Sequence, residues 1–150
     1  EVVAISQITA LSVVDFLKTH GITAKIKLPN DIYVGGRKIC GILIENSICS
    51  GKLGWSIIGI GININQTVFP SHLPNPTSLL LEKFRHAGFP LEMLQNQTQS
   101  LELNTLLAQF HEIYSEYYCR YISSNNNPYN THKSKLKALT QSFRSMLIYR

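Results

Sequence analysis

Three turn signals divide the apolar segment 22–65, and they constrain the fold more than any other feature of the chain. Pro29 lacks the N–H that a strand ladder needs, Gly35–Gly36 suits a tight hairpin turn, and Ser50–Gly51 begins another turn. The runs between these turns, ITAKIKL, DIYV, KICGILIENSIC and WSIIGIGINI, are strongly apolar and of strand length. The segment therefore predicts a β-sheet made of strands that follow one another in the chain.

The first of these runs alternates apolar and polar residues, so it predicts a half-buried strand with Lys25 and Lys27 facing outward. The two longer runs are mainly apolar on both faces. Strands of that composition are expected in the middle of a sheet that helices cover.

Helical patterns flank this sheet. Apolar residues recur every three positions over about 2–20, and Gly21 ends the pattern. A short helix is expected at 79–88, capped by Thr77 or Ser78. A longer helix is expected at 101–122, and its aromatic stripe is typical of core packing. The fold class predicted is α+β, a mixed β-sheet flanked by helices.

The net charge of +5 is not spread over the chain. Residues 1–123 hold nine basic and nine acidic residues, so all five excess charges lie in 124–150. We therefore interpret 1–123 as the folded domain and 124–150 as a polar linker and basic tail that could form a weak amphipathic helix. Binding to nucleic acid would depend on that tail alone and is not expected of the domain.

The three cysteines are sparse and show no Cys-x-x-Cys spacing, so no metal site is expected. Reduced, buried thiols are typical of cytoplasmic proteins, which is the predicted location. No apolar run reaches the roughly 18 residues of a membrane span, and the start does not read as a signal peptide.

The run IIGIGININ predicts two unlike faces on one strand. Gly59, Gly61, Asn63 and Asn65 share one face, and the four isoleucines share the other. Glycine is unfavourable inside a strand unless something approaches the backbone closely. A helix that crosses tightly is one explanation, and a polar ligand read by the asparagine amides is the other.

Two cationic side chains flank the turns of the same segment. Lys27 precedes the turn Pro29–Asp31, and Lys38 follows the glycine turn. Each feature alone is ordinary turn chemistry, but adjacent strand ends would bring both lysines and Asp31 to one face of the sheet. Such a site suits an anion such as a carboxylate or a phosphate.

These motifs resemble those of biotin protein ligases. The matching segments are KLPND, RKICGIL and GIGIN, in the family's order and spacing, followed by a PNPTSL loop that some members share. The resemblance covers about 1–122. It implies the biotin/lipoate ligase catalytic fold, which is similar to class II aminoacyl-tRNA synthetases.

The resemblance also implies a reaction and the residues that carry it. Biotin and ATP, with Mg²⁺, would give biotinyl-5'-AMP, and a lysine of a biotin carboxyl carrier protein would take the biotin. A homodimer is one assembly expected. The implied roles are Lys38 for the biotin carboxylate and the adenylate phosphate, Lys27 and Asn30 for the adenylate side, Asp31 for a lysine or the Mg²⁺–phosphate group, Gly41 for the biotin pocket, and Ile62 and Asn63 for the adenosine.

The chain also departs from the family. Leu28 stands where tryptophan is usual, and the family's Gly-Arg-Gly-Arg-x-Gly-Arg loop and small C-terminal domain have no counterpart in 1–150. An incomplete catalytic domain is therefore expected. The alternatives left open are a fragment that keeps the fold and part of the adenylate site without turnover, and a lipoate ligase on the related fold.

Overall fold

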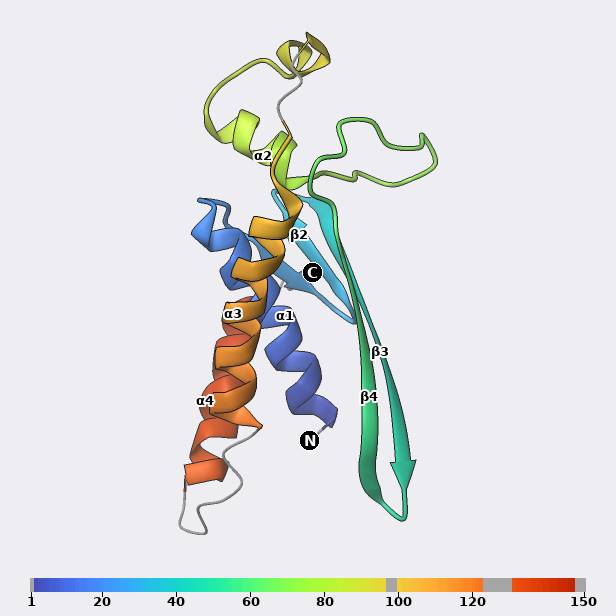
Figure 1. The fold of residues 1–150 in the computed structure, drawn as a ribbon, viewed down its shortest axis with the longest axis vertical. Helices are drawn as coiled ribbons and strands as arrows, with labels where there is room; N and C mark the ends of the chain where they lie inside the picture. Colours follow the sequence, from blue (N-terminus) through green and yellow to red (C-terminus); the bar gives the residue numbers. More distant parts are fainter. Residues whose placement is uncertain (1, 97–99, 123–130, 148–150) are drawn as a thin grey trace.

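A computed structural model describes residues 2–96, 100–122 and 131–147 (Figure 1). Its elements follow the order α1 (Val2–Thr19), β1 (Lys25–Lys27), β2 (Asp31–Val34), β3 (Arg37–Cys49), β4 (Lys52–Ile62), α2 (Leu79–His86), the 3₁₀ helix η1 (Leu91–Asn96), α3 (Leu103–Tyr121) and α4 (Thr131–Ser145). The predicted strands and helices are all present. The short helix begins after Ser78, whose side chain accepts a hydrogen bond from the Leu81 N–H and so caps it.

The four strands form one sheet in the order β1-β2-β3-β4, and each pair of neighbours is antiparallel. Consecutive strands therefore pair through the turns that the sequence marks. Gly35 and Gly36 have φ of 52° and 81°, a conformation that costs glycine little and other residues more. Parallel pairing within the described residues is limited to two isolated bridges, Ile26 with Leu147 and Lys38 with Pro76. The predicted α+β class is confirmed.

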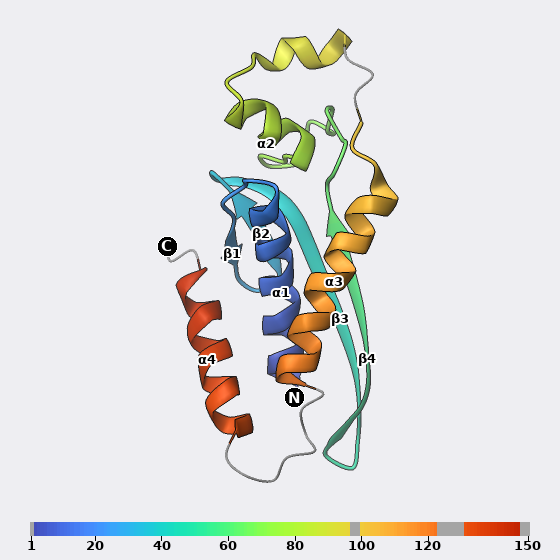
Figure 2. The same ribbon diagram turned by 60° about the vertical axis from the view of Figure 1, so that its left-hand side comes forward.

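One face of the sheet is packed. Helix α1 lies along it with α3 and α4 beside it, so these three helices are on the same side of the strands (Figures 1 and 2). The core between them contains Phe16, Ile26 and Ile32, none more than 1% exposed. By length and composition α1 could cross a membrane, but 67% of it is buried inside the protein, as in a core helix. Its apolarity is thus explained by packing.

The opposite face of the sheet is open, which corrects the expectation that helices cover the long strands. Gly59 and Gly61 are exposed, and no described helix crosses them (Figure 1). Leu43 and Ile57, on this face of the β3–β4 hairpin, are 64% and 58% exposed. The apolar pattern was misleading because only the isoleucine side of β4 packs against helices.

The C-terminal part of the described chain packs against the domain. Leu139 of α4 is fully buried, and Phe143 packs against the same core. The Ile26 N–H donates a hydrogen bond of 2.7 Å to the Met146 carbonyl, so residues after α4 pair with β1 at that end of the sheet. The helix expected here exists. The division into 1–123 and a tail from 124 stays a prediction, although residues 139–147 contact the body.

Candidate functional site

The open face brings together the catalytic candidates from three strands. Lys38 Nζ lies 2.6 Å from Asp31 Oδ1, with the two side chains 43% and 20% exposed. Asp31 pairs with Gly41 in the register of β2 and β3. A Cβ on Gly41 would lie 3.6 Å from Lys38 Nζ and 3.8 Å from Asp31 Oδ1, so glycine leaves the space above this ion pair free.

Lys27 lies on the same face because its position in β1 pairs with Asp31. Its ammonium is 4.8 Å from the centre of the Tyr33 ring and donates to the Tyr33 hydroxyl at 3.4 Å. The aromatic ring thus holds a second cation near the ion pair. The predicted convergence of Lys27, Lys38 and Asp31 is what the strand register produces.

Asn30 lies in the turn between β1 and β2 and is exposed. Its carbonyl accepts a hydrogen bond of 2.8 Å from the Ile42 N–H, which fixes this turn to β3. Its side chain is thereby placed at the end of the sheet where β2 begins.

The two adenosine candidates are placed differently. The Ile62 side chain lies on the packed side, where it lines an apolar groove of about 460 Å³ with Phe16 and Phe110, so the structure does not bring it to the open face. Asn63 follows the last residue of β4, and its Nδ2 donates to the Thr77 carbonyl at 3.0 Å. One of its two amide N–H donors is therefore used, and its Oδ1 and the other N–H are the parts that could meet a ligand.

Asn65 has a structural role, which corrects the view that its amide reads a ligand. Its Nδ2 donates to the Leu101 carbonyl at 2.9 Å, and its Oδ1 accepts from the Leu101 N–H at 2.8 Å. Both ends of the amide are used to hold the segment that leads into α3.

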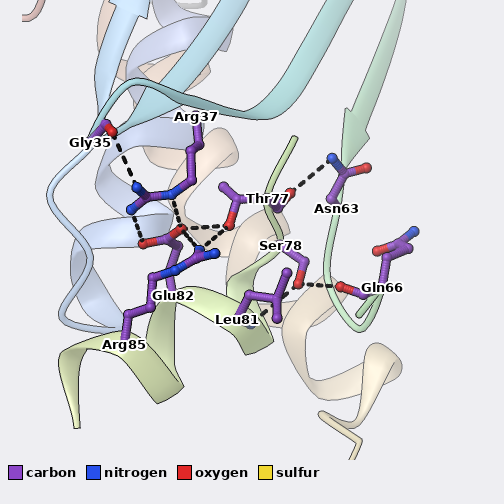
Figure 3. Close-up of polar contacts among 9 residues, drawn as sticks. All are labelled: Gly35, Arg37, Asn63, Gln66, Thr77, Ser78, Leu81, Glu82 and Arg85. Carbon is purple, nitrogen blue, oxygen red and sulfur yellow. Dashed lines mark hydrogen bonds and ion pairs between the residues drawn. The ribbon is translucent and has the colours of Figure 1, made fainter. Parts of the chain in front are cut away.

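A buried carboxylate network around Glu82 includes Arg37, the residue before Lys38, and the sequence did not reveal it (Figure 3). Glu82 is 1% exposed and accepts two bonds from Arg37, at 2.9 Å from Nε and 3.0 Å from Nη2. The Thr77 hydroxyl and Arg85 Nη1 also donate to it, each at 2.5 Å. Arg37 is thus half of an internal ion pair rather than a free hairpin end. The spacing of Thr77 and Glu82 around a predicted helix start was the available signal.

The network controls the ionisation of Glu82. Burial alone would raise the pKa of this carboxyl group, but the hydrogen bonds from Arg37 and Thr77 and the charges of both arginines outweigh it and lower the pKa. Glu82 therefore stays an anion that binds its partners.

The thiol beside the ion pair behaves differently. Burial raises the pKa of Cys40 to about 12, with the Lys38 charge acting in the opposite direction. Cys40 is thus a packing residue and not a nucleophile. Among the described residues, no group of three or more His, Cys, Asp or Glu could hold a metal ion.

Gly59 and Gly61, which the sequence placed on one face of their strand, form the floor of the site. A Cβ on Gly59 would meet Leu43 Cβ at 3.9 Å, and one on Gly61 would meet only the Gly41 carbonyl, at 3.7 Å. The floor beside the charged groups therefore consists of backbone with the single apolar side chain of Leu43 next to it.

The family comparison matches this part of the chain. Residues 2–63 match the model of the Biotin/lipoate A/B protein ligase family. Two relatives, both named Bifunctional ligase/repressor BirA, come from Bacillus subtilis and Bacillus spizizenii. Each is 42% identical over 74 residues, which is 45% of this chain and 23% of the relative.

The fold comparison extends over nearly the whole chain. A biotin protein ligase from Aquifex aeolicus in complex with biotin and ATP has a TM-score of 0.66 at 23% identity, covering 97% of this chain and 51% of that one. A Leishmania major enzyme in complex with biotinyl-5-AMP has a TM-score of 0.52 at 19% identity, covering 99% and 57%. These likenesses show that the fold is that of the biotin protein ligase catalytic domain.

The chain matches the biotin/lipoate A/B protein ligase family over residues 2–63, which is less than half of its length. It spans about half the length of these solved structures and less than a quarter of the Bacillus relatives. The candidate site lies largely within the matched segment, since Lys27, Asp31, Lys38, Gly41 and Asn63 all fall in it.

Proposed function

We propose that the protein of which this chain is part is a biotin protein ligase. The observation that carries the proposal is the Lys38–Asp31 ion pair beside the bare backbone of Gly41, on an open sheet face in a segment of this family. The bound biotin, ATP and biotinyl-5-AMP of the solved neighbours support the substrates.

In the first step a carboxylate oxygen of biotin attacks the α-phosphorus of ATP. The new bond gives biotinyl-5'-AMP, and the bond to the β-phosphate oxygen breaks to release pyrophosphate. Both reactants are anions, so their approach is opposed by charge repulsion. Lys38, oriented by Asp31, would neutralise the carboxylate and the α-phosphate, a type of contact worth about 3 kcal/mol in other enzymes.

The remaining site residues would hold the two substrates. Gly41 and the floor by Leu43 would admit the biotin ring, because no side chain fills that space. Lys27 and Asn30 would lie on the adenylate side, and Asn63 would contact the adenosine through Oδ1. For Ile62 only the backbone could take part, since its side chain faces the helices. Mg²⁺ is proposed as a companion of ATP.

In the second step the ε-amine of a carrier lysine attacks the carbonyl carbon of biotinyl-5'-AMP. An amide bond forms, AMP leaves, and the amine loses its proton. The carrier is proposed to be a biotin carboxyl carrier protein. A cytoplasmic location and a homodimer stay predictions.

The test is formation of biotinyl-5'-AMP by the chain from biotin, Mg²⁺ and ATP labelled in its α-phosphate. The expected product contains the label and biotin, and lipoate in place of biotin gives less product. More product with lipoate would favour lipoate ligation. Saturable binding of biotinyl-5'-AMP without any turnover would favour the alternative, a part of the ligase that keeps the site but not the activity.

A further inference from the structure

Thr77 joins the two sides of the candidate site. Its N–H donates to the Lys38 carbonyl at 2.8 Å, and its carbonyl accepts from the Asn63 amide at 3.0 Å. Its hydroxyl donates to Glu82 and accepts from Arg85 at 2.9 Å. Every polar group of this fully buried residue is therefore used, and two of the partners are proposed ligand-binding residues.

The strand that carries Lys38 depends on the same segment. The Lys38 N–H donates to the Asn75 carbonyl at 2.8 Å, so residues 75–77 hold both backbone polar groups of Lys38. Strand β4 ends at Ile62, and beyond that end residues 75–77 pair with β3 in its place, through the bridge between Lys38 and Pro76. Both backbone hydrogen bonds of Lys38 are thus made to a loop that has little regular structure of its own, while Tyr33 of β2 is its partner on the other side.

Glu82, in helix α2, holds the loop of residues 75–77 through its bond with Thr77. It binds the Thr77 hydroxyl and, through two bonds, the Arg37 side chain, which immediately precedes Lys38 (Figure 3). A buried carboxylate with charge-assisted bonds to three side chains resists displacement, because each lost bond would leave a buried charge less well paired.

We infer that Thr77 and Glu82 are positioning residues that set the placement of Lys38 and Asn63 relative to each other. Neither side chain reaches the open face. The inference rests on the proposed function, in which Lys38 binds the reacting phosphate and Asn63 binds the adenosine. A small displacement of such groups can lower a rate about a hundredfold.

The central variants are Thr77→Val, which keeps the shape but removes the hydroxyl, and Thr77→Ser, which keeps the hydroxyl but removes a buried methyl. Glu82→Gln is a second way to weaken the network if Thr77→Val does not fold. Ser78→Ala is the matched control, since it removes the cap of the same helix and the 2.6 Å bond to the Gln66 carbonyl without touching Lys38 or Asn63.

Amide hydrogen exchange by NMR tests the inference without any need for activity. In Thr77→Val we expect the N–H groups of Lys38 and Thr77 to exchange about tenfold faster, while that of Ile42, bonded to Asn30, is unchanged. Thr77→Ser and Ser78→Ala should stay within about threefold of the parent. No selective increase in Thr77→Val and Glu82→Gln, or an equal increase in Thr77→Ser and Ser78→Ala, overturns the inference.

The kinetic measurement then separates positioning from binding. Thr77→Val is expected to lower kcat for biotinyl-5'-AMP formation about a hundredfold with little change in KM for biotin, and Thr77→Ser to recover most of it. An unchanged kcat overturns the inference. If the parent chain makes no adenylate, the result bears on the activity of this chain and not on the network, and the exchange rates alone decide whether the network positions Lys38.

Discussion

The two faces of the sheet use the same strands for different purposes. On the packed face Ile26, Ile32 and Ile42 are at most 6% exposed and contact helices. On the open face Leu43 is 64% exposed, and Gly59 has no side chain beyond the backbone. Burial of side chains on one face is thus enough to stabilise the strands, and the other face is free to meet a ligand. Substitutions on the two faces should therefore affect different properties.

The largest effect is expected on the packed face. Phe16→Ala removes a ring that is 1% exposed and lies 5.8 Å from the Phe110 ring centre, so it should lower the free energy of unfolding by about 4 kcal/mol. Urea unfolding followed by circular dichroism measures it. Leu43→Ala on the open face should cost less than about 1 kcal/mol. Equal losses would show that the open face is also packed.

The next effect belongs to the open face alone. Lys38→Ala should reduce the rate of biotinyl-5'-AMP formation by about two to three orders of magnitude, because a cation that meets the reacting anions is lost. Its free energy of unfolding should change by less than about 1 kcal/mol, as for other partly exposed ion pairs. Labelled ATP measures the rate, and Lys52→Ala, an exposed lysine at the far end of β4, is the matched control.

A Lys38→Ala protein as active as the Lys52→Ala protein would remove the proposed role of Lys38. Loss of activity together with loss of folding would instead place Lys38 among the residues that stabilise the sheet.

Acid should weaken the fold in two steps, the first through His20 and the second through Glu82. Burial, followed by the Lys83 charge, lowers the pKa of His20 from 6.5 against an opposing bond with Gln109. The unfolded chain then binds the proton more readily, so the free energy of unfolding falls as the pH drops below about 6.5. The pKa of Glu82 is lowered from 4.5, so its contribution is present above that pH and is lost as the pH falls through the folded value.

Unfolding by urea between pH 8 and pH 3 measures both steps. His20→Gln should flatten the upper step and leave the lower one, and Glu82→Gln should flatten the lower step. A parent whose stability is constant from pH 7 to pH 3 would contradict both assignments.

The smallest effect on stability is expected at the floor of the site. In Gly41→Ala the new methyl would make ordinary contacts of 3.6 to 3.8 Å with Lys38 and Asp31, so the free energy of unfolding should change by less than about 1 kcal/mol. The methyl would occupy the space proposed for biotin, so KM for biotin should rise about tenfold or more. Unchanged kinetics would mean that the ligand does not approach the backbone at Gly41.

Much of the fold was readable because its signals are local. Pro29 and the turn glycines mark strand ends by their own backbone preferences, and the three-residue apolar period marks α1. Lys27, Asp31 and Lys38 could be grouped because consecutive antiparallel strands bring their ends together. The ion pair of Arg37 could not be predicted, because its partner Glu82 lies 45 residues away and looks like an ordinary acidic residue in the first turn of a helix.

The wrong expectations share one cause. The run in β4 looks apolar on both sides, yet glycine contributes no bulk, so only its isoleucine side needed a cover. Asn65 looked like a ligand-binding amide because its position after the strand was known, whereas its partner Leu101 was not. In both cases the sequence showed the type of the residue but not the residue that lies next to it in space.

By itself the amino-acid sequence determined which segments form strands and helices, the antiparallel hairpins and the family motifs, because each depends on residues close together in the chain. Only the tertiary structure decided which sheet face stays open, that Ile62 turns from the site, and that Thr77 and Glu82 hold Lys38 and Asn63. These features depend on contacts between segments that are distant in the chain. Such contacts form only when the helices pack against one face of the sheet.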